Sequence, residues 1–223
     1  MRPWAHEAFK KRLPKRSCLR PESARSMLHA ERFASALKRN LNVFLTINFN
    51  TLPRDPEANY YEIFRTKIWA NIRRRWNAHC KRQAIQRPFA AIAVFENPPN
   101  RREGPRHYGP KHVHALLEWP ADQIERLLYL VRRAMAKYFA RFRPSQVHVS
   151  EVGVGRARRT TSYMAKGIDP PFAAHFHLNH APQGHVAHRR IIISRCLGHA
   201  ARALFRKRGG NPLPNRRSPW ALY

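Results

Sequence analysis

Acidic residues are scarce in this chain of 223 residues, which carries 13 Asp and Glu against 43 Lys and Arg and a formal net charge of +30. Such an imbalance favours a polyanion such as DNA or RNA as the partner. It also suits a ribosome-associated protein or a generally basic proteome, so charge alone does not indicate an enzyme. Cysteine is scarce too: Cys18, Cys80 and Cys196 are scattered, and their spacing excludes a zinc ribbon and a disulfide framework.

Long apolar runs are missing as well, and no segment approaches the length of a membrane span. The opening residues Met1-Arg-Pro-Trp4 lack the apolar centre of a secretory signal. We therefore expect no membrane association and a cytoplasmic protein. The sequence also contains no Gly-x-x-x-x-Gly-Lys-Ser/Thr loop, which argues against a fused helicase.

Strand and helix patterns alternate through the middle of the chain. Runs of β-branched and aromatic residues predict strands, and apolar residues at helical spacing predict helices. The expected strands cover 43–49, 89–96, 111–118 and 146–152, and the expected helices cover 57–85, 120–142 and the segment that carries Tyr163. The order β-α-β-β-α-β predicts an α+β protein with a ferredoxin-like antiparallel sheet, helices on one face and the chemistry on the open face.

Basic extensions flank this central unit. We expect residues 1–40 to form a basic arm that is broken by proline and contains a short helix. Residues 41–205 would form the main domain, with a further strand at 190–193 near its end, and residues 206–223 would form a basic tail.

The pattern His-x-His occurs twice, at His112/His114 and at His175/His177. With 13 histidines in 223 residues, chance gives roughly 0.75 such pairs, so the spacing by itself carries no weight. The first pair lies in an expected strand, where alternate side chains share one face. The second pair lies in a proline-rich segment with no strand pattern and no nearby carboxylate, where we expect a loop without a metal.

Hairpin pairing can bring a carboxylate to the first pair. If residues that sum to 208 face each other, Glu96 opposes His112, and directly opposed residues share a face. Glu118 also shares that face, but it lies roughly 13 Å beyond His114 along the strand, too far for one site. Two imidazoles and one carboxylate leave coordination positions open for a substrate. Imidazole suits zinc or manganese, and a carboxylate with a phosphate substrate favours Mg²⁺ or Mn²⁺. The simpler interpretation is a pair of ordinary strand histidines on a basic surface.

A tyrosine and a lysine follow on a basic helix, at Tyr163 and Lys166. Thr160 or Thr161 could cap this helix, which would place Tyr163 in the first turns, where amide dipoles attract phosphate. Lys166 lies three residues further on and shares a face with Tyr163, where a cation would favour the phenolate or hold a phosphate. The simpler interpretation is a core tyrosine and a solvated lysine.

Three motifs in this order resemble those of the HUH endonucleases, and within them the rolling-circle replication initiators (Rep proteins) with a single catalytic tyrosine. They are Phe44-Leu-Thr-Ile-Asn48 in the first strand, His112-Val-His114, and Tyr163-Met-Ala-Lys166. The resemblance covers about residues 42–168, and it would make 41–205 an HUH-like catalytic domain. Conjugative relaxases of this superfamily carry the tyrosine before the histidines, whereas here it follows them.

The resemblance implies a concrete chemistry. A divalent metal, Mg²⁺ or Mn²⁺ rather than Zn²⁺, would be held by His112, His114 and Glu96 and would polarise a scissile phosphodiester. Tyr163 would attack it, leaving a 5′-phosphotyrosine and a free 3′-OH, with Lys166 assisting. The DNA contacts would come from Thr46, Asn48, Arg156, Arg158 and Arg159.

The partners implied are a single-stranded or hairpin origin and a separate host helicase and polymerase. Two other functions remain open. One is a single-tyrosine HUH transposase, which would use the same residues. The other is a non-catalytic nucleic-acid binder with an RNA-recognition-like sheet, on which Phe44 would stack against a base. A covalent adduct with DNA would separate the catalytic functions from the binder.

Overall fold

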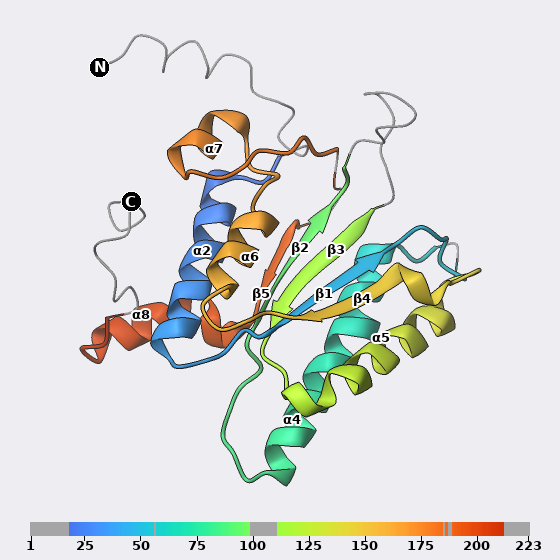
Figure 1. Cartoon of the computed structure of the whole chain (residues 1–223), viewed down its shortest axis with the longest axis horizontal. Helices are drawn as coiled ribbons and strands as arrows, with labels where there is room; N and C mark the ends of the chain where they lie inside the picture. The colour runs from blue at the N-terminus through green and yellow to red at the C-terminus, as the bar shows by residue number, and fades with distance from the viewer. Residues whose placement is uncertain (1–17, 56, 99–110, 185, 187–188, 212–223) are drawn as a thin grey trace.

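The structure is a computed structural model that describes residues 18–55, 57–98, 111–184, 186 and 189–211 (Figure 1). Residues 1–17 of the expected basic arm, most of the loop between the second and third strands and most of the expected basic tail lie outside the described residues. Within the described part of the chain, no helix combines the length and the apolar character needed to cross a membrane.

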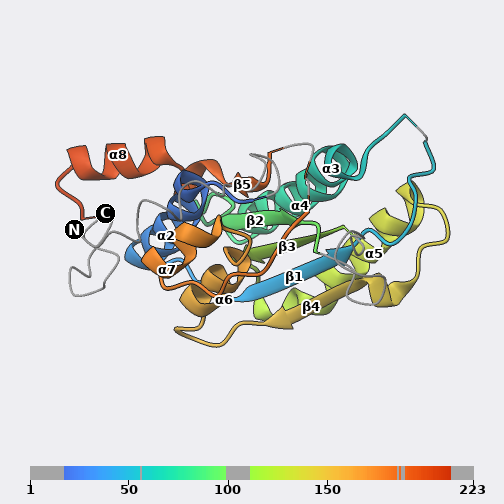
Figure 2. The same ribbon diagram turned by 90° about the horizontal axis from the view of Figure 1, so that it is seen from above.

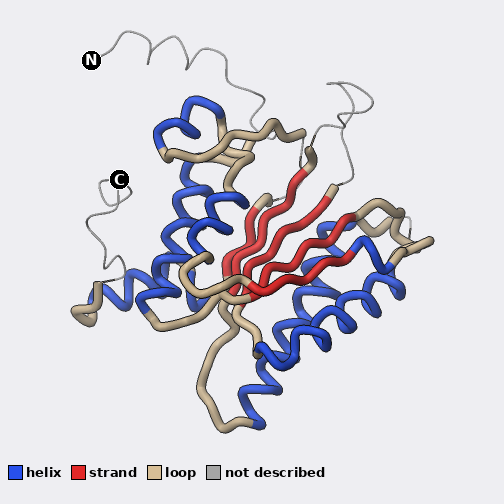
Figure 3. Tube along the Cα trace, in the orientation of Figure 1, coloured by secondary structure: helices blue, strands red, loops and turns tan. Residues whose placement is uncertain are grey.

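Five strands form one antiparallel sheet in the order β4-β1-β3-β2-β5 (Figure 3). The strands are β1 (Val43–Asn48), β2 (Ala91–Glu96), β3 (His112–Leu117), β4 (Val147–Glu151) and β5 (Ile191–Ile193). The helices are α2 (Pro21–Ala36), α3 (Tyr60–Ile63), the π-helix η1 (Phe64–Trp69), α4 (Ala70–Arg82), α5 (Ile124–Tyr138), α6 (Ala157–Met164), α7 (Pro170–His175) and α8 (His199–Lys207). Short 3₁₀ turns cover Ala121–Gln123, Pro144–Gln146 and Arg195–Leu197. The α+β class and the antiparallel sheet are confirmed, and the order of β1 to β4 is compatible with a ferredoxin-like fold.

Each face of the sheet carries its own apolar core. On the first face, side chains such as Leu45, Phe95 and Val113 pack against η1, α4 and α5. On the second face, Ile92 and Leu116 pack into a core formed with α2, α6 and α8. Figures 1 and 2 show the sheet between these two groups of helices.

The expectation that helices lie on one face only is therefore wrong. The reason lies in β2, whose six residues are all buried, so that both sides of this strand are apolar and both need cover. Helix α2, expected as part of an arm, supplies some of this cover: Met27 and Phe33 are buried in the second core.

One long helix between β1 and β2 contains the π segment. Its apolar residues Tyr60, Phe64, Ile68, Ile72 and Trp76 recur at every fourth position. In an ideal α-helix each step of four residues overshoots a full turn by about 40°, so this stripe would wind around the helix. A π segment has more residues per turn, and η1 at Phe64–Trp69 keeps the stripe directed at the sheet. The helix begins at Tyr60 because the Asn59 side chain accepts a hydrogen bond from the Glu62 amide.

Candidate metal centre and tyrosine

The β2–β3 hairpin has the expected register. Glu96 pairs with His112, and the two residues sum to 208 as predicted. On the other side of β3, β1 places Asn48 opposite His112 and Thr46 opposite His114. Both histidines therefore project from the second face in the middle of the sheet, with a carboxylate on one side and polar residues on the other.

Three side chains converge closely enough to bind one ion. Single ligand atoms of Glu96, His112 and His114 all lie within 4.8 Å of one another. Glu96 Oε2 lies 3.0 Å from His112 Nε2 and 3.7 Å from His114 Nε2. Two ligands that each bind one ion at about 2.1 Å are themselves about 3.0 Å apart at a right angle and about 3.4 Å apart in a tetrahedron. The observed separations therefore suit a shared ion.

Two buried atoms of this cluster lack hydrogen bonds. Glu96 is 2% exposed and His114 is 5% exposed, yet Glu96 Oε1 and His114 Nε2 have no hydrogen-bond partner among the described residues. A buried polar atom without a partner is costly, and it is often the mark of an ion or a catalytic role. Among the described residues, this is the one group of three or more that could hold a metal. At the other His-x-His pair, the expected loop is wrong for His175, which is the last residue of helix α7.

Contacts on the far side of its ring orient His114. Its Nδ1 atom lies 2.9 Å from Thr46 Oγ1, and its ring stacks on Phe44 at 5.1 Å between centroids with 19° between the planes. When Nδ1 carries the proton and donates a hydrogen bond to Thr46 Oγ1, Nε2 is left with a free lone pair. This arrangement is how ligand histidines are prepared for a metal.

The electrostatics keep the carboxylate charged and His114 neutral. Burial raises the pKa of Glu96, but the hydrogen bond with His112 and the attraction of His114 and Lys166 together outweigh burial and hold this pKa below its ordinary value. Burial lowers the pKa of His114 to about 3, and the positive charge of Lys166 acts in the same direction. A metal requires a charged carboxylate and a neutral imidazole, and the folded chain supplies both.

Tyr163 lies over the same cluster. Helix α6 packs on β3 and on α2, and it brings the Tyr163 ring to 5.5 Å from the His114 ring and 6.3 Å from the Phe44 ring. The side chain is 50% exposed, so the phenol is on the correct side of the sheet and open to a substrate.

The start of this helix differs from the prediction. Helix α6 begins at Ala157, and the hydroxyls of Thr160 and Thr161 donate to the carbonyls of Arg156 and Ala157 instead of capping the amides. Tyr163 therefore lies in the last turn, where no free amides attract a phosphate. The local reason is that the residues before Thr160 continue the helix by a full turn.

Lys166 joins the acid to the tyrosine. Its Nζ atom is 2.8 Å from Glu96 Oε2 and 3.7 Å from the centroid of the Tyr163 ring. The side chain is 14% exposed. An ammonium group over the face of a phenol is attracted to the ring, and it offsets negative charge that develops on the phenol oxygen. The lysine is thus held at the site and is not a solvated surface residue.

The other residues expected to contact DNA lie on α6 and β1. Arg156, Arg158 and Arg159 are exposed at the start of α6, and Asn48 is half-buried beside His112. Thr46 instead contacts His114. Contact of these residues with DNA stays a prediction.

A tether formed by residues 181–184 was not anticipated from the sequence, where this segment has no recognisable pattern. The Ala181 amide donates to the Lys166 carbonyl at 2.8 Å, and the Gly184 amide donates to the Asn97 carbonyl at 2.6 Å. Between them, Gln183 accepts from the Asn97 amide at 3.0 Å. Gly167 allows this approach, because a Cβ atom there would meet Gln183 at 2.8 Å. The tether therefore fixes the residue after Glu96 and the turn that carries Lys166.

No family model, no curated protein and no solved structure matches this chain. The function has to be argued from the residues of the site themselves.

Proposed function

We propose that this chain is a metal-dependent, single-strand DNA endonuclease and strand transferase of the HUH type, which nicks an origin to initiate rolling-circle replication. One observation carries the proposal: the three ligand residues, the tyrosine and the lysine come from three distant segments and converge at one point on the sheet. Each residue alone has an ordinary explanation. Their convergence with two unpartnered buried atoms suits a catalytic site better than a structural one.

Glu96, His112 and His114 would hold the metal, and Mg²⁺ or Mn²⁺ suits a mixed nitrogen and oxygen set that acts on phosphate. Such an ion, when bound, polarises a phosphate oxygen and offsets the charge that builds up in the transition state. Thr46 and Phe44 fix the ring of His114, so the ligands are arranged before the substrate arrives.

Tyr163 would act as the nucleophile. The phenol loses its proton to solvent or to a substrate group, and its oxygen forms a bond to the scissile phosphorus while the bond from phosphorus to O3′ breaks. The electron pair of that bond leaves with O3′, which takes up a proton and becomes the 3′-OH. The products are a 5′-phosphotyrosine and a primer end.

Lys166 would stabilise the phenolate. Its ammonium group already lies over the Tyr163 ring, and it is held there by Glu96. It can also turn toward a phosphate oxygen, because its flexible stem carries a mobile point charge.

The surroundings favour a single strand as the substrate. Glu96 and His114 are buried, His112 is partly buried and the tyrosine is half exposed, so an accessible, unpaired strand would bring the scissile phosphate to the sheet most readily. A host helicase would then separate the strands, and a host polymerase would extend the 3′-OH.

The RNA-recognition-like alternative is less consistent with the site. Its stacking ring would be Phe44, but this ring is already stacked on His114 and lies edge-on to Tyr163. A base would have to displace one of these partners. The transposase alternative uses the same chemistry, and the products of strand transfer would distinguish it.

The test is a covalent adduct. The purified chain is incubated with Mn²⁺ and a labelled single-stranded DNA library of random sequence, and the mixture is run on a denaturing gel. We expect an adduct with the wild type that disappears in Tyr163→Phe and with EDTA. Tyr129→Phe is a matched control, because Tyr129 is 60% exposed on α5 and far from the cluster in sequence and fold.

An adduct that persists in Tyr163→Phe would refute the assignment of the nucleophile. If no adduct forms with the library, with circular single-stranded DNA or with DNA from beside the gene, the chain is a binder and the proposed chemistry is wrong.

A further inference from the structure

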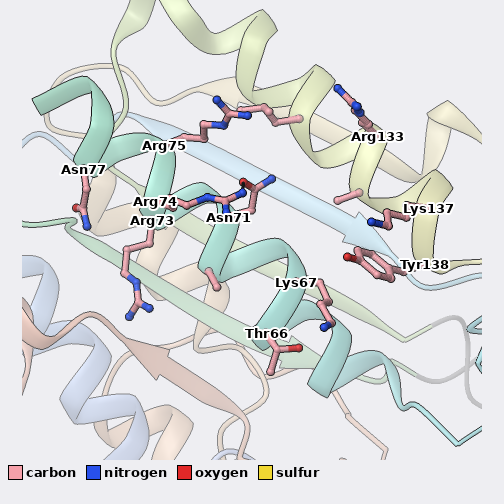
Figure 4. Close-up of a pocket in the computed structure, with 13 residues that line it drawn as sticks. Thr66, Lys67, Asn71, Arg73, Arg74, Arg75, Asn77, Arg133, Lys137 and Tyr138 are labelled. Carbon is pink, nitrogen blue, oxygen red and sulfur yellow. Dashed lines mark hydrogen bonds between the residues drawn. The ribbon is translucent and has the colours of Figure 1, made fainter. Parts of the chain in front are cut away.

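A groove of about 720 Å³ lies between two helices on the opposite side of the sheet from the metal centre. Residues from η1 and α4 form one wall, and residues from α5 form the other (Figure 4). These helices pack on the first face of the sheet, whereas the ligand histidines project from the second. The groove is therefore separate from the catalytic site.

The lining of the groove is strongly cationic. Six of its residues are lysine or arginine: Lys67, Arg73, Arg74, Arg75, Arg133 and Lys137. None of the described residues that line it is acidic. At the metal centre, by contrast, Lys166 faces the carboxylate of Glu96. Six like charges without a counter-charge in the lining repel one another, and an anion bound in the groove would offset this repulsion.

Some of these cations are already held in place. Lys67 and Lys137 come from different walls, and their ammonium groups lie 6.0 Å and 5.4 Å from the centroid of the Tyr138 ring. Arg74 donates to the Asn71 side chain at 3.0 Å. Figure 4 shows Lys67, Lys137 and Tyr138 together, with Asn71 and Arg74 further along between the helices. Side chains that are ordered beforehand lose less freedom when a ligand binds.

We propose that this groove binds the phosphodiester backbone of DNA, outside the segment that is nicked. The choice of DNA rests on the proposed function, and the groove extends it by giving the substrate a second contact. Charge without carboxylates, amide groups at Asn71 and Asn77, and an aromatic ring with a hydroxyl at Tyr138 suit phosphate and sugar oxygens. A single strand and a duplex beside the origin both offer this chemistry, and the two DNA probes below distinguish them.

The experiment compares two triple variants. The groove variant is Lys67→Gln/Arg74→Gln/Lys137→Gln, and all three residues are exposed, so folding is retained. The control variant is Lys81→Gln/Arg82→Gln/Arg208→Gln, which removes the same charge from exposed positions outside the groove. Circular dichroism verifies the fold of each.

Binding is measured by fluorescence anisotropy with a 40-nucleotide single strand, a 40-base-pair duplex and poly-glutamate, over a series of salt concentrations. Every protein carries Tyr163→Phe and is kept in EDTA, so no reaction takes place. The slope of log K against log salt reports the number of phosphates contacted. We expect the groove variant to lose about 2 units of slope on the single strand or about 2.7 on the duplex. The control variant should keep the slope of its parent.

The probe that shows the loss identifies the form of DNA that the groove binds. Equal losses in both triple variants, or no loss on either DNA, would overturn the proposal. A loss on poly-glutamate as large as that on DNA would also overturn it, because the groove would then be a general anion surface. An absent covalent adduct counts against the proposed nicking alone, since this experiment does not depend on it.

Discussion

Metal binding should stabilise the fold, and Glu96→Gln should abolish that effect. The substitution keeps the shape of a side chain that is 2% exposed and removes the charge that faces His112, His114 and Lys166. Gln can still offer one oxygen as a ligand, but it carries no negative charge to balance the positive charge of a buried divalent ion. The ligand set would then be two imidazoles with no anion.

The magnitudes follow from linkage. A ligand present at 100 times its Kd stabilises the native state by about 2.7 kcal/mol. For a domain of this size each kcal/mol shifts the Tm by about 2–4 °C, so saturating Mn²⁺ should raise the Tm of the wild type by about 5–11 °C. Without metal, Glu96→Gln should cost about 1–3 kcal/mol, less than the about 3–5 kcal/mol of a fully buried pair, because Lys166 can reach solvent.

The assay is thermal unfolding by differential scanning fluorimetry with and without MnCl₂, with urea unfolding for the free energies. Two controls match the perturbation. His175→Gln/His177→Gln removes the other His-x-His pair and should leave the Mn²⁺ shift intact. Glu118→Gln removes a second buried glutamate, which pairs with Arg39 and Arg87; it should destabilise the fold yet keep the shift. An equal Mn²⁺ shift in the wild type and in Glu96→Gln would refute the assignment of the ligands.

Two further predictions concern His114. The pKa of His114 is about 3 in the folded chain and 6.5 ordinarily, so the unfolded chain binds a proton that the native state does not as the pH falls below about 6.5. Stability should therefore drop by up to about 1.4 kcal/mol per pH unit between pH 6.5 and 4, measured by urea unfolding in metal-free buffer. The pKa of His29 is also lowered, to about 4, so His29 contributes a loss of stability with the same sign. The series is therefore run in a His29→Asn background. A free energy of unfolding that does not change with pH in this background would contradict a buried, neutral His114. Thr46→Val should weaken Mn²⁺ binding about 10–100-fold by calorimetry, because it removes the group that orients the ring; an unchanged Kd would show that Phe44 suffices.

Local patterns were enough to predict the central hairpin. The apolar and β-branched runs at 89–96 and 111–118 indicate two neighbouring strands. Both faces of the first strand are apolar, so its sequence does not specify the register of the pair. The pairing of Glu96 with His112 rests on an assumed register, which the structure confirms, and this is how the three residues that could hold a metal were named from the sequence.

Features that depend on packing between distant segments could not be predicted. The cover of the second face by α2 and α6 requires knowing that both sides of β2 are buried. The start of α6 at Ala157 depends on a competition in which the Thr160 and Thr161 hydroxyls bond backward along the helix. The contact of Gln183 with Asn97 joins residues 86 positions apart, and no local signal marks either of them.

The tether of residues 181–184 has a consequence for how this chain can vary. One short piece of backbone is hydrogen-bonded both to Asn97, which follows Glu96 at the end of β2, and to Lys166 in the turn after Tyr163. Any change of length there would move the end of β2 and the turn that carries Lys166 together, so the position of Glu96 relative to Tyr163 depends on both attachments at once.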